Sequence, residues 1–354
     1  MPAFFNGVFG HKPTGGVVPC TGQFPVVTAG MLVITHSPSP LATHSHSSVR
    51  SLSLSRARAR STEVLQRYLT TGPIARHACD LWPMLRLLAG PDGVDKACTE
   101  RSPALEHEPA QVELATLQVV VIKDLEHLSP PLVSALQPEL IAAYRRTVEH
   151  LRSRGCHIRE IETLRYFDRS PDIWIAMVAL SGGSSFKSKL CNGQRQDLNL
   201  SLELLKWGVG ASDFTLPALL YALVDQLPAL TPARTAALAR DGDAMRRYVI
   251  DEVLHINTAA AAGVRIANTV LLFPPHPTTA PKHDWPLLRI YNWLYTGIWN
   301  VLELPATQVP LGLDTQGLPL GIQVVGLPHH DHVTIAVAEE LERAFGGWVR
   351  PPHM

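Results

Sequence analysis

A strand–helix–strand pattern in the first half of the chain constrains the fold more than any other feature. Residues 114–125 (LATLQVVVIKDL) contain a β-branched run typical of a buried strand, and 156–164 (CHIREIETL) alternate as a second strand would. Between them, 138–155 predicts a helix that ends at Gly155. Its apolar face carries Leu140, Tyr144, Val148 and Leu151. A helix of this length between two strands indicates parallel strands covered by helices, and hence an α/β fold.

The C-terminal part of the chain predicts a β-hairpin followed by a helix. In 307–326 (TQVPLGLDTQGLPLGIQVVG), two apolar strands flank the turn-forming residues 314–317. The helix is expected to begin with Asp331 as its N-cap and to end at Gly346-Gly347. The residues that it should carry inward are Val333, Val337, Leu341 and Phe345.

The N-terminal part predicts less regular structure. Residues 1–30 are expected to form short strands and turns, with strand or core over 3–9. After the Gly72-Pro73 break, an amphipathic helix is expected to end at Gly90-Pro91. Its apolar positions are Ile74, Ala78, Leu81 and Leu85.

The middle of the chain, about 170–260, reads as mostly helical. Within it, 201–227 (SLELLKWGVGASDFTLPALLYALVDQL) predicts two short apolar helices around the breaks at 208–210 and Pro217. The segment 31–61 differs, because it is rich in Ser, His and Arg and contains no Asp or Glu. We interpret it as a disordered insertion or a basic surface loop, or, in the reading that we favour, as non-native sequence.

Composition excludes several classes of function. With 354 residues, 46% of them hydrophobic, the chain can bury a large core. Its formal net charge of zero gives no basic field, so we expect no nucleic-acid partner. Five cysteines without a C-x-x-C pair argue against a disulfide framework or a thiolate zinc site. No apolar run approaches the roughly 20 residues that cross a bilayer, so this chain by itself is expected to be cytoplasmic.

Three motifs could indicate a functional site, but the spacing of their residues is not sufficient to assign one. The sixteen histidines could include the ligands of a metal site. However, His329, His330 and His332 lie in a turn where Asp331 is expected to cap a helix, so we expect no metal. Lys12 lacks the order of a phosphate-binding loop and is interpreted as a turn lysine. The stretch 180–185 (LSGGSS) lacks the spacing of a serine-nucleophile turn and is interpreted as a helix end or loop.

Several longer stretches resemble the amidase signature family, and within it the fatty-acid amide hydrolase 2 branch. The similarity covers 1–30 and 62–354, which we interpret as the start and the remainder of one truncated amidase domain interrupted by 31–61. The stretches that carry it are MPAFFNGVFGHKPTGGVVP, TGPIARHACDLWPMLRLLAG, FPPHPTTAPKH, YTGIWNVLELPATQVPLGLDTQGLPLGIQVVG and AEELERAFGGWVRPP.

The resemblance implies the C-terminal part of an α/β/α sandwich with a mixed sheet. It also implies a mechanism that uses a lysine, a bridging serine and a nucleophilic serine, without a cofactor. In the family, the stretch matching 2–14 follows directly after the signature that carries the nucleophile. All three catalytic residues would therefore lie before Met1. We assign no catalytic residue and expect the chain to be inactive by itself.

By the same resemblance, the chain would retain the side of the domain that binds a fatty-acid amide. A fatty acyl group is recognised through buried apolar area, at about 25 cal/mol per Å². The full-length family form would be a membrane-associated lipid-amide hydrolase, and 201–227 would contact the membrane surface. Alternatively, the chain is a non-catalytic product that binds lipid, forms a homo-oligomer or pairs with an intact paralogue. The residues expected near the acyl chain are Trp174, Met177, Trp207, Phe214, Leu216, Leu219 and Tyr221.

Overall fold

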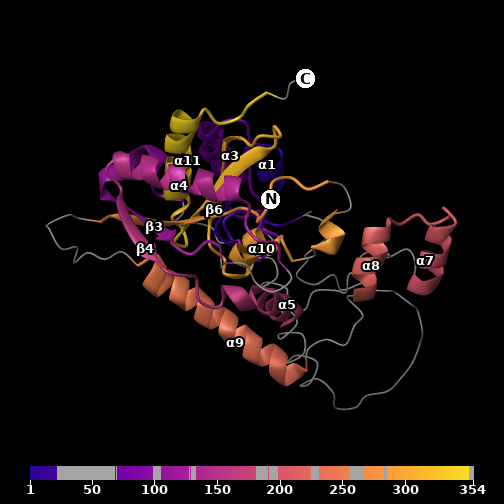
Figure 1. Ribbon diagram of the computed structural model, residues 1–354. Coiled ribbons are helices and arrows are strands. Elements are labelled where there is room, and N and C mark those ends of the chain that lie inside the picture. Colours follow the sequence, from indigo (N-terminus) through magenta and orange to yellow (C-terminus); the bar gives the residue numbers. More distant parts are fainter. Residues whose placement is uncertain are drawn as a thin grey trace, which may run out of the picture.

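A mixed β-sheet forms the centre of the molecule (Figure 1). The strands that the structure describes number seven, in the order β2-β1-β6-β7-β5-β3-β4. Their bounds are β1 Phe9–Lys12, β2 Ile74–Ala75, β3 Leu117–Ile122, β4 His157–Ile161, β5 Asn268–Phe273, β6 Ala306–Leu313 and β7 Pro319–Gly326. The computed structural model describes residues 1–21, 68, 70–98, 105–126, 128, 133–180, 190, 198–224, 231–255, 266–282, 285–289 and 291–350.

The parallel part of the sheet is the predicted strand–helix–strand unit. β3 lies parallel to both β4 and β5, and the crossover between β3 and β4 contains the helix α4, Pro138–Ser153. Tyr144 of α4 ties this unit together, because its hydroxyl accepts a hydrogen bond from the Ile122 N–H (2.9 Å) and donates one to the Leu272 carbonyl (3.3 Å). The α/β prediction is confirmed.

The antiparallel part contains the predicted hairpin. β6 and β7 pair with each other, β1 runs antiparallel along β6, and β5 runs antiparallel to β7. At the turn, the Asp314 carboxylate accepts hydrogen bonds from the N–H groups of Gln316 and Leu318, both at 2.8 Å. Gly317 adopts φ 78°, a conformation that glycine takes without strain. Parallel and antiparallel pairs together make the mixed sheet that was expected.

Helices cover both faces of the sheet (Figure 1). α11 and α4 pack against one face, whereas α10 lies on the other, with α5 and α9 beyond it. The two short apolar helices predicted in 201–227 are present as α7 and α8, which protrude to one side. The helix bounds are α1 Pro2–Phe5, α3 Leu81–Leu88, α4 Pro138–Ser153, α5 Ser170–Leu180, α7 Leu200–Gly208, α8 Leu216–Val224, α9 Pro232–Tyr248, α10 Leu294–Val301 and α11 Asp331–Phe345.

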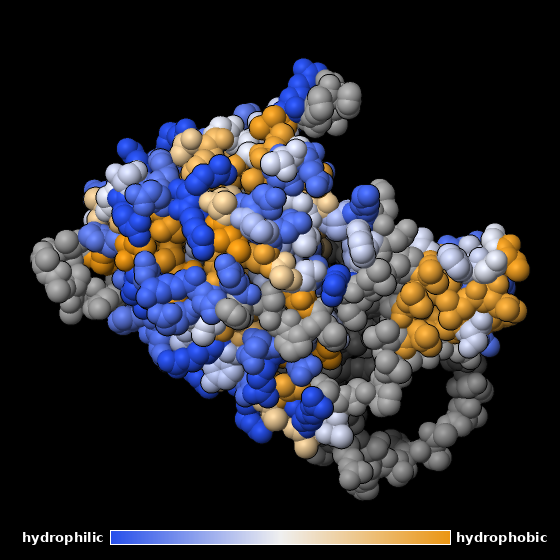
Figure 2. Space-filling view, viewed as in Figure 1, coloured by the Kyte–Doolittle hydropathy of each residue, from blue (hydrophilic) through white to orange (hydrophobic). Residues whose placement is uncertain are grey.

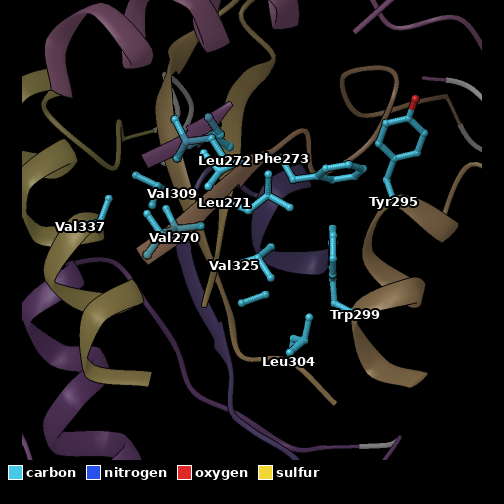
Figure 3. Packing of buried hydrophobic residues seen from close by; sticks show 14 of the residues in the cluster. Val270, Leu271, Leu272, Phe273, Tyr295, Trp299, Leu304, Val309, Val325 and Val337 are labelled. Carbon is cyan, nitrogen blue, oxygen red and sulfur yellow. The ribbon is translucent and has the colours of Figure 1, made fainter. Parts of the chain in front are cut away.

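The core is centred on β5 and the helix α10 that packs on it (Figure 3). β5 is apolar at consecutive positions because helices cover both of its faces, as central strands of such sheets require. Phe273 contacts the rings of Tyr295 and Trp299 of α10, with centroids 5.5 and 5.0 Å apart. These three aromatic side chains are fully buried.

Four local predictions need correction. Ala3 and Phe4 are buried, so the core alternative for 3–9 is confirmed, but residues 2–5 form a short helix and not a strand. Pro2 suits the first helical turn, and the Phe5 and Asn6 N–H groups bond back to Met1 and Pro2. Ile74 belongs to β2, where it pairs with Gly10, and the regular helix starts only at Leu81.

The other two corrections concern polar residues. Lys12 ends a strand rather than occupying a turn, because it pairs with Ala306 of β6. His330, not Asp331, occupies the N-cap position of α11, because the Asp331 carboxylate bonds to β1 and the following loop instead of to its own helix. The segments 31–61 and 181–185 lie outside the described residues.

Candidate functional site

A cleft of about 480 Å³ opens where β1 and β6 meet the ends of α5 and α10. The residues around it are both polar and apolar, as in sites for amphipathic small molecules. Those that the description below uses are Gly10, Lys12, Trp174, Trp293, Thr296, Gly297, Asn300, Ala306, Gln308 and Gln323.

The floor of the cleft is built by neighbouring positions on three strands. Gly10 of β1 pairs with Gln308 of β6, which in turn pairs with Gln323 of β7. Since side chains alternate along a strand, these positions share one face of the sheet. Gly10 contributes no side chain, and an added Cβ there would come within 2.6 Å of the Ala3 Cβ. The floor therefore presents two amide side chains beside a strand position that the Ala3 side chain covers.

Two tryptophans form an aromatic wall. Trp174 of α5 and Trp293, just before α10, meet edge to face with ring centroids 4.5 Å apart. Both are half-buried, so part of each ring faces the cleft. The Trp293 ring lies directly over Gly297, where any side chain would overlap it. The wall can therefore supply apolar and aromatic contact area to a ligand.

Lys12 places an ammonium group at the cleft. Its Nζ donates a hydrogen bond to the Pro13 carbonyl (2.9 Å). Burial lowers the pKa of this lysine to about 8, although the negative charges of Asp331 and Glu303 oppose the shift. At neutral pH the group is still protonated and can donate hydrogen bonds to a carbonyl or carboxylate oxygen.

Behind the floor, a buried polar network locks β1 to the start of α11. The Asp331 carboxylate accepts hydrogen bonds from His11 Nε2 (3.1 Å), the Thr14 N–H (2.8 Å) and the Thr14 hydroxyl (2.6 Å). The other ring nitrogen of His11 lies 2.9 Å from the Thr307 hydroxyl of β6. His11 is among the residues that line the cleft, but its side chain is fully buried and bonded to Asp331 and Thr307. This network therefore positions the strands that carry the cleft.

The clustered histidines at the start of α11 do not form a metal centre among the residues that the structure describes. The rings of His330 and His332 stack with centroids 5.8 Å apart, and His107 lies 5.3 Å from His332. Burial lowers the pKa of His332 to about 4 and also lowers that of His330. His332 is therefore neutral at physiological pH, and no ligand set converges on one point among the described residues.

The structure separates the predicted acyl-binding residues into two groups. Trp174 and Met177 lie on α5, and only Trp174 lines the cleft, whereas Met177 is buried against Gly242 of α9. The others lie on or between α7 and α8. Leu219 is fully buried there in a small separate core, Phe214 packs on it, Leu216 is half-buried, Trp207 is 44% exposed, and Tyr221 is a residue of α8.

The sequence analysis missed most of the cleft. Trp293, Gln308 and Gln323 were not singled out, although they line it. The sequence did contain one indication of the cleft. Gln308 and Gln323 interrupt the two apolar strands of the predicted hairpin, at positions that face the same side of the sheet. Polar residues in strands covered on both faces need a specific partner or role.

Comparison with known proteins places the chain in a family. The family model described as Amidase matches residues 46–335. "Fatty-acid amide hydrolase 2" of Homo sapiens is 33% identical over 357 residues, covering 99% of this chain and 56% of that protein. "Fatty-acid amide hydrolase 2-A" of Danio rerio is 31% identical over 365 residues, with the same coverage of 99% and 56%.

Solved structures support the same fold. The structure of 6-aminohexanoate cyclic dimer hydrolase superposes with a TM-score of 0.60 at 20% identity, over 99% of this chain and 63% of that one. These matches define an amidase-type α/β protein. The chain belongs to the amidase signature family, as the sequence resemblance implied. It spans about 56% of the length of the curated relatives named above.

Proposed function

We propose that this chain forms the substrate-binding side of a hydrolase that acts on long-chain amides. The observation that carries the proposal is the cleft, which combines amide and ammonium groups on its floor with a paired tryptophan wall. Such a cleft suits a ligand with a polar head and an apolar chain. The names of the curated relatives support a fatty-acid amide as that ligand.

The proposal assigns binding, not bond cleavage, to these 354 residues. By the family resemblance, the lysine and the two serines of the mechanism precede the stretch that begins at Met1. Amide hydrolysis needs an activated nucleophile, a proton relay and an oxyanion hole. The chain by itself is therefore proposed to bind a long-chain amide without hydrolysing it.

The test measures binding and hydrolysis on the same preparation of the 354-residue chain. Equilibrium dialysis with radiolabelled oleamide should show saturable binding, while release of oleic acid stays at the level of buffer. Trp174→Ala and Trp293→Ala should each weaken binding about 5-fold or more through lost apolar contact. Trp285→Ala is the control, because that side chain is 53% exposed and does not line the cleft. Acid release that a serine-directed fluorophosphonate abolishes would contradict the proposal.

We further propose that α7 and α8 contact the membrane surface that holds such substrates. Figure 2 shows apolar side chains gathered over these helices. We call them the α7–α8 surface, which consists of Leu202, Leu205, Trp207, Val209, Leu220 and Leu223, each at least 37% exposed. Burying such a surface in the interfacial region of a bilayer removes apolar area from water. Among the helices in the described part of the chain, none has the length and apolar character needed to cross a bilayer.

Vesicle binding tests this contact. Leu205 is 72% exposed on the α7–α8 surface, so Leu205→Asp should reduce co-flotation with phosphatidylcholine vesicles about tenfold. Leu87→Asp is the matched control, since Leu87 is 86% exposed on α3, away from that surface. Equal losses for the two variants would show that any exposed leucine suffices and would refute a role for α7 and α8.

A further inference from the structure

Two buried glutamines stand side by side on the floor of the cleft. Gln308 of β6 and Gln323 of β7 are paired across the hairpin, and their exposed fractions are only 6% and 4%. Buried amide groups normally have all of their polar atoms hydrogen-bonded. The hydrogen bonds of these two side chains therefore indicate which of their atoms remain for a ligand.

Gln323 is held with its carbonyl oxygen free. Its Nε2 donates to the Pro274 carbonyl (2.8 Å) and to the Tyr295 carbonyl (3.0 Å), which uses both of its hydrogens. These two bonds fix the orientation of the amide, so Nε2 and Oε1 cannot exchange places. Oε1 has no hydrogen-bond partner within the described part of the chain.

Gln308 on the neighbouring strand is held differently. Its Nε2 donates to the Val309 carbonyl (3.0 Å), and its Oε1 is enclosed without a hydrogen-bond partner among the described residues. The space around this side chain is narrow, because a Cβ added at Gly321 would overlap Nε2. The amide is therefore confined, and its enclosed oxygen is out of reach of a ligand in the cleft.

We propose that Gln323 is the acceptor that recognises an N–H group of the substrate amide, which makes it a specificity-determining residue. This inference rests on the proposed function. Its carbonyl oxygen accepts hydrogen bonds only, so it pairs with the N–H of a primary or secondary amide. An ester or a tertiary amide offers no such donor and leaves that oxygen unpaired. Lys12, in the same cleft, can donate to the carbonyl oxygen that all three ligand types share.

The experiment compares three ligands of one chain length on the full 354-residue chain: oleamide, N,N-dimethyloleamide and methyl oleate. Oleamide is expected to bind about tenfold or more tightly than either analogue, because only it donates N–H groups. The ester controls for the added bulk of the dimethylamide. Binding is measured by equilibrium dialysis, which requires no catalysis.

Two variants assign the selectivity to the floor of the cleft. Gln323→Met should weaken oleamide binding about 5- to 10-fold and leave methyl oleate binding unchanged. It should also lower the melting temperature, because the carbonyls of Pro274 and Tyr295 lose their hydrogen-bond donor. Gln118→Met is the matched control, because Gln118 is an equally buried strand glutamine (6%) whose Nε2 bonds to His255 and Thr269 away from the cleft. That variant should lose stability but keep the ligand selectivity.

The outcomes separate this inference from the proposed function. Equal affinity of the wild-type chain for all three ligands would overturn the inference and leave the proposed function standing. Failure of all three to bind would overturn both. The wild-type ligand series decides the matter even where a variant does not fold.

Discussion

Replacing Trp299 by alanine is expected to lower the free energy of unfolding by about 3–5 kcal/mol. Trp299 is fully buried on α10 and meets Phe273 of β5 edge to face, with centroids 5.0 Å apart (Figure 3). Its removal leaves a cavity between the helix and the centre of the sheet, and the surrounding strands can close it only in part. Urea unfolding followed by far-UV circular dichroism measures the change.

Trp207→Ala is the matched control for this experiment. Trp207 is 44% exposed on α7, outside the main core, so its loss should cost less than about 1 kcal/mol. A similar cost for both variants would mean that α10 does not pack on β5 as described. A small loss for Trp299→Ala together with a raised slope of unfolding would also contradict a rigid core.

The helices and strands with a clear apolar period could be predicted from the sequence. The β3-α4-β4 unit, the terminal hairpin and the inward face of α11 follow from local patterns, because burial on one side imposes a period of 3.6 or 2. The predictions were wrong where a residue far away in the sequence determines the local structure. Ile74 is a strand residue only because Gly10 lies beside it, and Asp331 is not a cap only because His11 and Thr14 reach it.

The cleft could not be predicted in the same way, because its parts meet only in the folded chain. Gly10 is separated in sequence from Gln308 by almost the whole protein, and Trp174 from Trp293 by several helices, yet each pair is adjacent in space. The expected acyl-binding residues were chosen for apolar character along the chain. That criterion finds Trp174, but it cannot tell a cleft wall from the separate core under α7 and α8.

Replacing Asp331 by alanine is expected to cost about 3–5 kcal/mol of folding free energy. The carboxylate is fully buried and accepts three hydrogen bonds, one from His11 and two from Thr14. Its loss leaves a buried backbone N–H and a ring nitrogen unpaired. Asp331→Asn should cost less, because it keeps the shape and one acceptor. Glu339→Ala, on the same helix, should cost under about 1 kcal/mol.

The pH dependence of this loss tests its electrostatic origin. Burial alone would raise the pKa of the Asp331 carboxyl, but the hydrogen bonds and charge of His11, together with the hydrogen bonds from Thr14, lower it below its ordinary value of 3.8. A carboxyl with a depressed pKa stabilises the folded state above its unfolded pKa and loses that contribution only as the pH falls through the folded value. The difference in unfolding free energy between wild type and Asp331→Ala should therefore not decrease between pH 7 and pH 5. A difference that halves across that interval would place the titration of the carboxyl there and would refute this account of the network.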